Sequence, residues 1–274
     1  MLKFSTVFIL LPLILLTACG GSTGNEPMTP DMAKSMLKLK GYDFTEANFF
    51  RAVRANDIAA VKAFFDAGIN PNARNEKGET ALTFAIQSAE PKTVKALLEK
   101  ADVNLQDSFG NSPIHLSLLK NKEDVFNALL EKNADVNVAG RDGKTEGQTV
   151  LYLAVIRGRE DLVEKLLERG ANPNLADKSG AAPLAEACIG AGVKPEIIKM
   201  LIDKGANVNH QESNGATPLL YIASNNQISS EARTEIVKML LAAGADKSLK
   251  AKNGITPLNA AKQMKNTDVM EILK

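Results

Sequence analysis

The sequence predicts an all-α solenoid of about seven helix-turn-helix units, including a cap at each end, joined by β-hairpin or turn connections. A short phrase opening with glycine recurs six times, and the spacings between its glycines are 32, 37, 33, 35 and 39 residues. A second phrase, two bulky aliphatic residues followed by Ala-Asp or Ala-Asn, accompanies the first in step. Such a period is typical of solenoids, in which neighbouring units supply each other's core.

Residues 1–18 have the features of a leader that is removed from the mature protein. One lysine precedes an apolar run over residues 4–16, which Pro12 interrupts. The run is shorter than the roughly 20 residues of a membrane-spanning helix but suits a signal peptide. It ends in Leu16-Thr17-Ala18-Cys19, which resembles a bacterial lipobox. The resemblance implies a lipid on Cys19, and Gly20 after it favours the periplasmic face of the outer membrane in a Gram-negative host.

Residues 19–30 contain the lipidated cysteine and a linker, and residues 31–47 form an N-terminal capping segment. The linker is rich in Gly, Ser and Pro and shows no hydrophobic period, so we expect it to be flexible. Residues 31–40 have the pattern of a short amphipathic helix, which Thr29 or Asp31 is placed to cap.

Residues 48–274 contain the repeated units. In the unit from Gly147 to Gly170, apolar residues follow the i, i+3, i+4 pattern of two short helices. Threonine precedes the first helix as a cap in four units, at Thr80, Thr149, Thr217 and Thr256. Gly170 follows the second helix, and Asn133 takes that place one unit earlier, as expected where φ is positive.

The two recurring phrases resemble the ankyrin repeat, and the resemblance covers about residues 48–274. It implies stacked helix pairs, a protein-binding function, and an inter-repeat hydrogen-bonding role for His115, which ends the Ser-Pro-Ile-His phrase. In this family, partners bind the hairpin tips and the ends of the first helices. Here those positions are Arg74, Glu76, Lys77, Phe109, Arg141, Lys144, Lys178, Asn214 and Lys252 at tips, and Leu119, Lys120, Ile156 and Arg157 at helix ends.

We prefer Phe109, Leu119, Ile156 and Arg157 as anchors, because aromatic, aliphatic and Arg residues carry most interface energy. Phe109 has a second interpretation, in which it packs against the neighbouring hairpin.

Three departures from the repeat are informative. The first full unit lacks one residue near Lys100, so we expect a distorted helix end. The hairpin around residues 141–146 is longer, and so are the loops near 189–195 and 225–231. Solenoid insertions lie on surface loops, often at a binding face, and neutral drift is the alternative.

The sequence offers little for catalysis, metals or nucleic acid. The net charge of +1 gives no electrostatic footprint for nucleic acid, and the chain has two His and two Cys. The carboxylates are scattered, so no pair is placed for acid–base chemistry. Cys188 is expected to be a buried small hydrophobe, with a reactive thiol as the alternative, and His210 a surface residue.

Three stretches resemble known functional motifs but lack a residue or a context that the chemistry of each motif requires. Residues 135–146 partly match a calcium loop, but Ala139 has no side-chain oxygen. Lys144 follows Gly143 without the first glycine of a P-loop. Ser22 matches the letters of a nucleophile elbow but lies in the linker. We therefore expect no catalytic residue, cofactor or metal.

The leading hypothesis is a membrane-tethered, non-enzymatic protein–protein interaction scaffold in the bacterial cell envelope, for example an accessory or immunity-type partner of a periplasmic protein. It would bind another envelope protein and the membrane, with no nucleic acid and no small-molecule substrate. The alternatives are a secreted ankyrin effector that binds host proteins and a lipoprotein enzyme or ligand binder.

Overall fold

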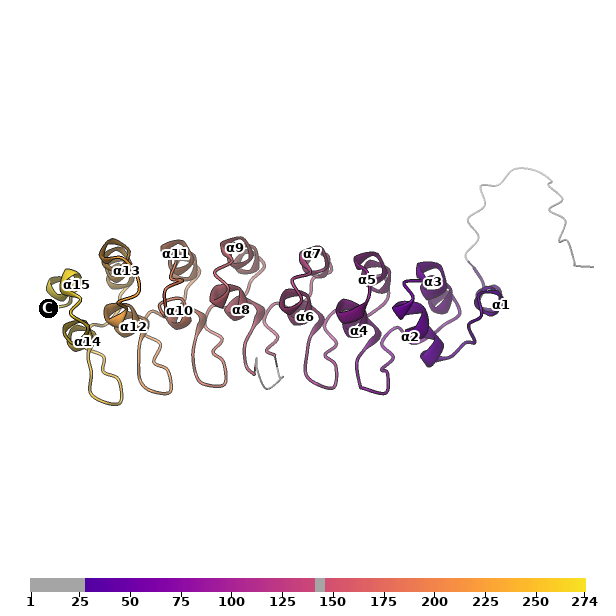
Figure 1. The fold of residues 1–274 in the computed structure, drawn as a ribbon, viewed down its shortest axis with the longest axis horizontal. Helices are drawn as coiled ribbons and strands as arrows, with labels where there is room; N and C mark the ends of the chain where they lie inside the picture. The colour runs from indigo at the N-terminus through magenta and orange to yellow at the C-terminus, as the bar shows by residue number, and fades with distance from the viewer. Residues whose placement is uncertain (1–27, 141–145) are drawn as a thin grey trace, which may run out of the picture.

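The computed structural model describes residues 28–140 and 146–274, which form one row of helix pairs (Figure 1). The predicted leader, Cys19, Arg141 and Lys144 lie outside these residues. The helices, in chain order, are α1 (Pro30–Leu39), α2 (Glu46–Arg54), α3 (Ile58–Asp66), α4 (Ala81–Ser88), α5 (Pro91–Leu97), α6 (Pro113–Leu119), α7 (Glu123–Glu131), α8 (Val150–Ile156), α9 (Glu160–Glu168), α10 (Pro183–Glu186), α11 (Pro195–Asp203), α12 (Pro218–Ser224), α13 (Ser230–Ala242), α14 (Pro257–Met264) and α15 (Thr267–Leu273).

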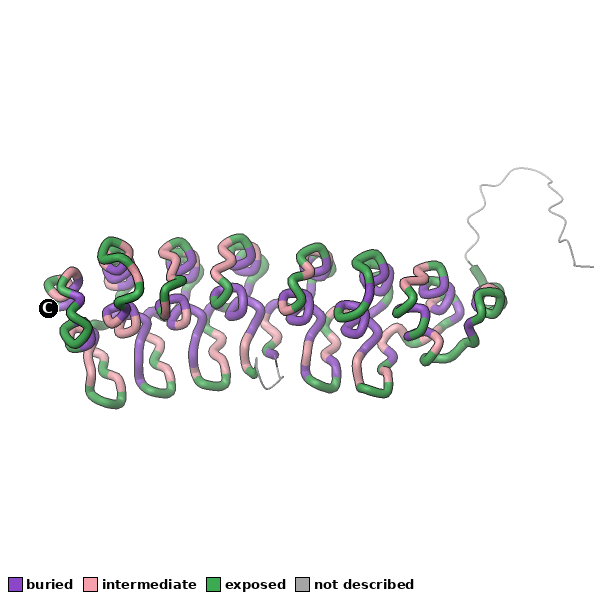
Figure 2. Tube along the Cα trace, viewed as in Figure 1, coloured by how far each residue is buried: buried purple, intermediate pink, exposed green. Residues whose placement is uncertain are grey.

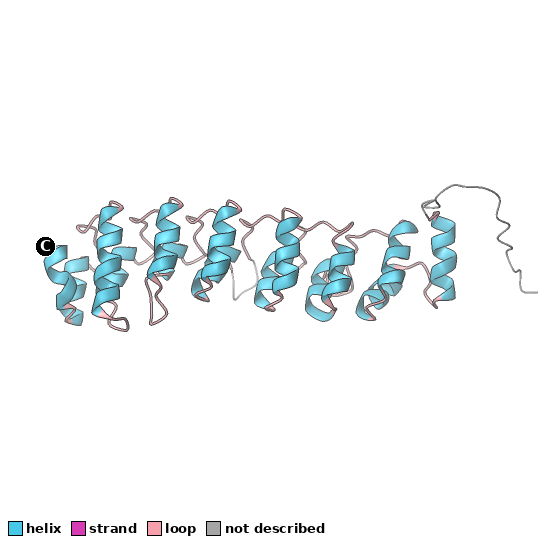
Figure 3. Ribbon diagram, turned by 90° about the horizontal axis from the view of Figure 1, so that it is seen from above, coloured by secondary structure: helices cyan, strands magenta, loops and turns pink. Residues whose placement is uncertain are grey.

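The helices from α2 to α15 form seven antiparallel pairs, which confirms the predicted count, and α1 packs on α3 at one end. Seen from above, successive pairs run side by side along the axis (Figure 3). Six long loops project from one side of the row, and we call them fingers (Figure 1). In the described part of the chain the fingers contain no β-sheet. Arg74 and Thr80 form an isolated antiparallel bridge, so the fingers are built of turns rather than of paired β-hairpin strands.

The first helix of each pair begins after a Thr or Ser whose side chain caps it, except α10, which begins after Ala182. The hydroxyls of Thr80, Thr149, Thr217 and Thr256 each accept a hydrogen bond from the backbone N–H three residues later, as predicted. Thr29, rather than Asp31, caps α1 in the same way, so that helix starts at Pro30.

Apart from α15, the second helix of each pair is followed by a residue with positive φ, with one exception. Gly170 has a φ of 81° and Asn133 a φ of 57°, as predicted. The exception is α5, which ends at Leu97 and has no left-handed residue after it. Its last turn closes through a 2.8 Å bond from Ala101 N–H to the Leu97 carbonyl, which confirms the distorted end.

The core is a continuous apolar layer between the two rows of helices and between neighbouring pairs (Figure 2). At the N-terminal end it is aromatic, and Phe49 and Phe64 are fully buried with ring centroids 5.6 Å apart. Cys188 is fully buried, as predicted, and burial raises the pKa of its thiol. Across residues 28–140 and 146–274, no helix combines the length and apolarity needed to cross a membrane.

Side-chain amides connect each unit to the next and form what we call the asparagine ladder. At each step an Asn Oδ1 accepts the backbone N–H that begins the following unit, at 2.7–2.8 Å. The five steps are Asn72 to Asp102, Asn104 to Asp135, Asn137 to Asn172, Asn174 to Asn207, and Asn209 to Asp246. The ladder fixes the spacing of the fingers.

Candidate functional site

The fingers and the first helices of the pairs form one long surface, which we call the finger face (Figure 1). All the predicted finger residues in the described part of the chain are exposed: Arg74, Glu76, Lys77, Phe109, Lys178, Asn214 and Lys252. They are spread over several fingers, and only Arg74, Glu76 and Lys77 lie together.

Some of the predicted binding residues also hold the fingers in place. Arg74 donates to the Gly78 carbonyl of its own finger at 2.9 Å and to the Gln106 carbonyl of the next at 2.7 Å. Lys178 forms a 2.7 Å ion pair with Glu146 of the preceding finger. Their exposed charges are therefore partly satisfied, which lowers what each can contribute to a partner.

Phe109 is 55% exposed at the tip of the second finger, which favours its role as an anchor over packing against a neighbour. The turn beneath it is rigid because Asp107, itself buried, accepts the N–H groups of Phe109 and Asn111 at 3.0 and 2.9 Å. The ring is thus presented on a fixed backbone.

The four predicted helix-end residues gather at the adjoining ends of α6 and α8. Ile156 is 49% exposed and Lys120 is exposed, whereas Leu119 is half-buried against the core. Arg157 donates to the Leu118 carbonyl at 2.5 Å, so its guanidinium closes the end of α6. Of the four, Ile156 thus presents an exposed apolar side chain, whereas the Arg157 guanidinium is bonded to the preceding unit.

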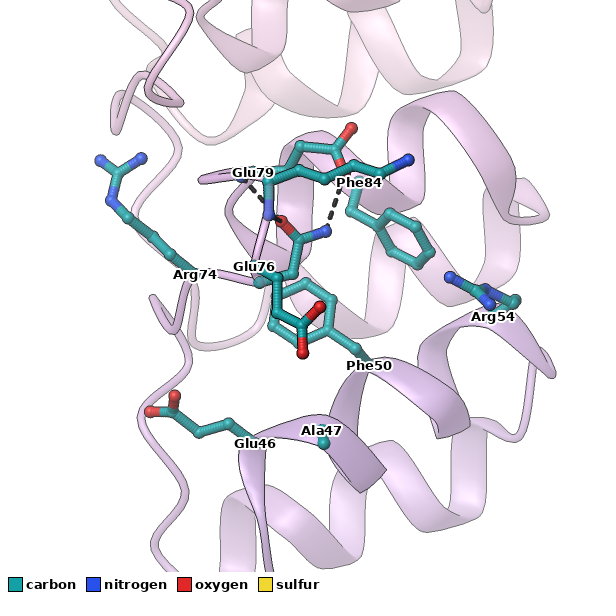
Figure 4. Close-up of a pocket in the computed structure, with 10 residues that line it drawn as sticks. Glu46, Ala47, Phe50, Arg54, Arg74, Glu76, Glu79 and Phe84 are labelled. Atoms are coloured by element: carbon teal, nitrogen blue, oxygen red, sulfur yellow. Dashed lines mark hydrogen bonds between the residues drawn. The ribbon is translucent and has the colours of Figure 1, made fainter.

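A groove of about 400 Å³ lies at the N-terminal end of the finger face (Figure 4). We call it the N-terminal groove; its walls are Glu46, Ala47, Phe50 and Arg54 of α2, Arg74, Asn75, Glu76, Lys77 and Glu79 of the first finger, and Phe84 of α4. The rings of Phe50 and Phe84 meet edge to face at 5.6 Å and form an aromatic floor. The repeat pattern pointed to Arg74, Glu76 and Lys77 but gave no signal for the α2 side, because the capping unit lacks the recurring phrase.

Charges at the N-terminal groove are unevenly satisfied. Glu79 accepts hydrogen bonds from Asn75 at 2.7 Å and from Gln87 at 3.0 Å. The guanidinium of Arg54 lies 5.4 Å from the centre of the Phe84 ring and makes no hydrogen bond or ion pair with a described residue. Glu46 lies on the far side of Phe50 from Arg54 (Figure 4). Lys77 also lines the groove, and its ammonium makes no hydrogen bond or ion pair with a described residue, so the groove offers two available cations, Arg54 and Lys77, beside an apolar floor.

A second polar cluster lies on α8, α10 and α12, although the sequence suggested only scattered carboxylates. The Tyr152 hydroxyl donates to Glu186 at 3.2 Å, and the Tyr221 hydroxyl donates to Glu212. Burial, with the charges of Glu212 and Asp177, raises the pKa of Glu186. Burial and the bond to Glu212 raise the pKa of Tyr221 to about 12. These groups come together because residues about 35 apart align in the stack.

Both histidines connect repeats. His115 shares a 2.7 Å hydrogen bond with the Ser112 hydroxyl and a 2.8 Å bond with the Gln148 carbonyl of the next unit, which is the inter-repeat role that the resemblance implied. The expectation for His210 was wrong: it is half-buried and bonds the Gly180 carbonyl at 2.7 Å. Neighbouring fingers lie close enough for a histidine side chain of one unit to bond a backbone carbonyl of the adjacent unit.

No group of three or more His, Cys, Asp or Glu in residues 28–140 and 146–274 is arranged to hold a metal ion. In the calcium-like stretch, Asp135 accepts the Asn137 N–H at 2.8 Å, and Asn137 belongs to the asparagine ladder. The repeat therefore explains the two residues that suggested a calcium loop.

Comparison with known proteins identifies the architecture. A family model for ankyrin repeats matches residues 49–140, 137–211 and 184–274. The ankyrin repeat domain of Bcl-3 superposes with a TM-score of 0.65 at 28% identity, covering 82% of this chain and 96% of that one. EF0377, an ankyrin repeat protein, superposes with a TM-score of 0.60 at 26% identity, covering 73% and 98%.

Curated relatives share the repeats over part of their length. Human transient receptor potential cation channel subfamily A member 1 is 32% identical over 111 residues, which are 40% of this chain and 10% of the channel. Ankyrin repeat-containing protein P1E11.10 of Schizosaccharomyces pombe is 30% identical over 108 residues, or 39% and 51% of the two chains. The chain thus matches about half the length of these relatives or less.

Proposed function

Because the chain belongs to the ankyrin-repeat family, whose members are protein–protein interaction scaffolds, we propose that its finger face binds another protein of the bacterial cell envelope while a lipid on Cys19 tethers it to the membrane. Its role is binding without catalysis. The observation that carries the binding proposal is the pair of exposed apolar side chains on a fixed backbone, Phe109 at 55% and Ile156 at 49% exposure. A preformed surface lowers the entropy cost of association.

The sequence around Cys19 supports the tether. A lipid-modified cysteine directly after a cleaved leader would leave the folded row a short linker away from the bilayer. Several acyl chains make such anchoring stable, because each buried methylene contributes about 0.8 kcal/mol. The envelope partner would then be met at the membrane surface.

Crosslinking in intact cells tests the binding surface. The full chain with a C-terminal tag is crosslinked and purified in parallel with Phe109→Ala and Ile156→Ala, and recovered proteins are quantified by mass spectrometry. One partner should fall at least fivefold with either variant, since buried anchors are worth about 1–3 kcal/mol. Leu39→Ala is the matched control, because Leu39 is 90% exposed on α1, away from the finger face.

Recovery of the same proteins in equal amounts with all four baits would reject the finger face as the binding site. Fractionation tests the tether separately: the wild-type chain should stay with membranes and Cys19→Ala should leave them. Wild-type protein free in the medium and insensitive to globomycin would reject the tether and favour the secreted effector.

A further inference from the structure

The first finger has an open side that the other fingers lack. The backbone N–H two residues before the finger glycine donates to a carbonyl of the preceding finger at three of the four described steps: Ser108 to Gly78 at 3.0 Å, Lys178 to Glu146 at 3.2 Å, and Lys252 to Asn214 at 2.8 Å. At the fourth step the Ser213 hydroxyl donates to the Ser179 carbonyl instead. Glu76 holds this position in the first finger, but the α2–α3 unit before it has no finger. Its N–H therefore has no partner among the described residues.

This free donor borders the N-terminal groove. Next to it lie the edges of Phe50 and Phe84, each 8% exposed, and beyond them the available guanidinium of Arg54 (Figure 4). A backbone donor, an aromatic floor and a cation thus follow one another within a cleft of about 400 Å³. The order of these three groups along the groove is complementary to an extended peptide, which offers a carbonyl, an apolar side chain and a carboxylate in short succession.

We propose that the N-terminal groove binds an extended segment of the protein partner, in which an aromatic or branched aliphatic residue adjoins Asp or Glu. The segment takes the place of the missing finger: its carbonyl accepts the Glu76 N–H, its apolar side chain covers Phe50 and Phe84, and its carboxylate pairs with Arg54. An ion pair here forms beside an aromatic ring and is partly shielded from water, which strengthens it. This inference rests on the proposed protein-binding function.

Peptide display tests the chemistry directly. Random linear peptides on phage are selected against the full chain, and the most enriched ones are synthesised with a fluorophore. Enriched sequences should carry Asp or Glu next to an aromatic or branched residue. Fluorescence polarisation should show affinity falling at least tenfold in Arg54→Glu, because a charge-assisted bond becomes a repulsion. Ala47→Trp should also weaken binding, since Ala47 is an exposed wall residue and a larger side chain fills the groove without changing charge.

Lys95→Glu is the matched control, because it makes the same charge change at an exposed position on α5 outside the groove. Circular dichroism melting of each variant checks that the fold is kept. An enriched set without acidic residues, no enrichment, or equal affinity for the wild type and Arg54→Glu would overturn the groove assignment. If Phe109→Ala still loses the envelope partner in that case, the scaffold function stands and only this inference fails.

Discussion

Several buried polar residues in the described part of the chain bond across neighbouring repeats, and the others bond within their own unit. Arg233 is 7% exposed in α13, and its guanidinium donates to both oxygens of Asp268 at 2.8 and 3.0 Å and to the Asn225 carbonyl at 2.5 Å. It thereby joins the lengthened loop at 225–231 to the C-terminal cap. That loop is thus bound into the structure on one side, with Asn225 itself reaching the Gly190 carbonyl at 2.8 Å.

Replacing Arg233 with methionine should destabilise the protein by about 3 kcal/mol, because it leaves Asp268 without its cation in a mostly buried site. Urea unfolding followed by circular dichroism measures the change. Lys199→Met is the control: it removes the exposed Lys199–Asp203 pair and should cost less than about 1 kcal/mol. Equal losses in the two variants would show that burial does not set the value of the ion pair.

Glu186 makes stability depend on pH. Burial first, and then the charges of Glu212 and Asp177, raise the pKa of the folded-state carboxyl above its ordinary value of 4.5. A raised pKa means that the folded state binds the proton more tightly, so stability falls as pH rises through the folded-state pKa. Since Glu186 is half-buried, solvent screening keeps the loss at neutral pH below about 1 kcal/mol.

Glu186→Gln should remove this loss while keeping an acceptor for the Tyr152 hydroxyl. The variant should be more stable than the wild type at neutral pH, by less than about 1 kcal/mol, and should match it at about pH 3, where the carboxyl is almost fully protonated in both states. Denaturant titrations across this range measure the difference, with exposed Glu235→Gln as the control. A variant less stable than the wild type at neutral pH would contradict the expected sign.

At the level of single helices, the ends are set by a few backbone positions. Five of the second helices end at a Gly or Asn with positive φ, whereas α14 ends at Lys265 with a φ of 60°. A lysine in this region carries a Cβ that crowds the backbone, at about 1 kcal/mol. The first helix of the C-terminal pair, α14, thus ends at a strained residue.

Lys265→Gly should stabilise the protein by about 0.5–1 kcal/mol, since glycine adopts this conformation without strain. Lys265→Ala is the control, because it removes the same side chain and keeps the Cβ. The reverse change, Gly244→Ala, should destabilise by about 1–2 kcal/mol through backbone strain alone: its φ is 91° and an added Cβ would meet no atom within 4 Å. Thermal melting of the three variants separates strain from packing.

Helix boundaries were predictable from the sequence because they depend on local chemistry. Thr149 before α8, Asn133 after α7 and the missing residue after α5 each act on their own backbone. The contacts of Arg54 and Arg233 were not predictable in this way. Their partners, Phe84 and Asp268, lie about 30–35 residues away and are fixed by how far each unit rotates on the next.

At the scale of the whole molecule, stability is a sum of units and the contacts between neighbours. Asn137 lies midway along the row and makes two such contacts: it accepts the Asn172 N–H at 2.8 Å and donates to the Gly170 carbonyl at 3.1 Å. Weakening one central junction in such a row should separate the unfolding of its two sides.

Asn137→Ala should destabilise the chain by about 0.5–1.5 kcal/mol and broaden or split the urea transition, because two hydrogen bonds between units are lost at a central junction. Asn127→Ala is the control, since Asn127 accepts one hydrogen bond, from Lys165, on the outer helices. Fluorophores placed separately on the N-terminal and C-terminal halves follow the two sides. Coincident transitions at both labels would indicate that the junction is not a weak point.

The asparagine ladder has a consequence for how such a protein can change length over evolution. Each step of the ladder joins a side chain of one unit to a main-chain N–H of the next, as in Asn104 to Asp135 and Asn174 to Asn207. A main-chain donor is supplied by every residue type except proline. A duplicated or deleted copy of the repeat therefore meets a compatible junction at once, so gene-level gain or loss of whole units needs no accompanying substitutions to keep the row joined.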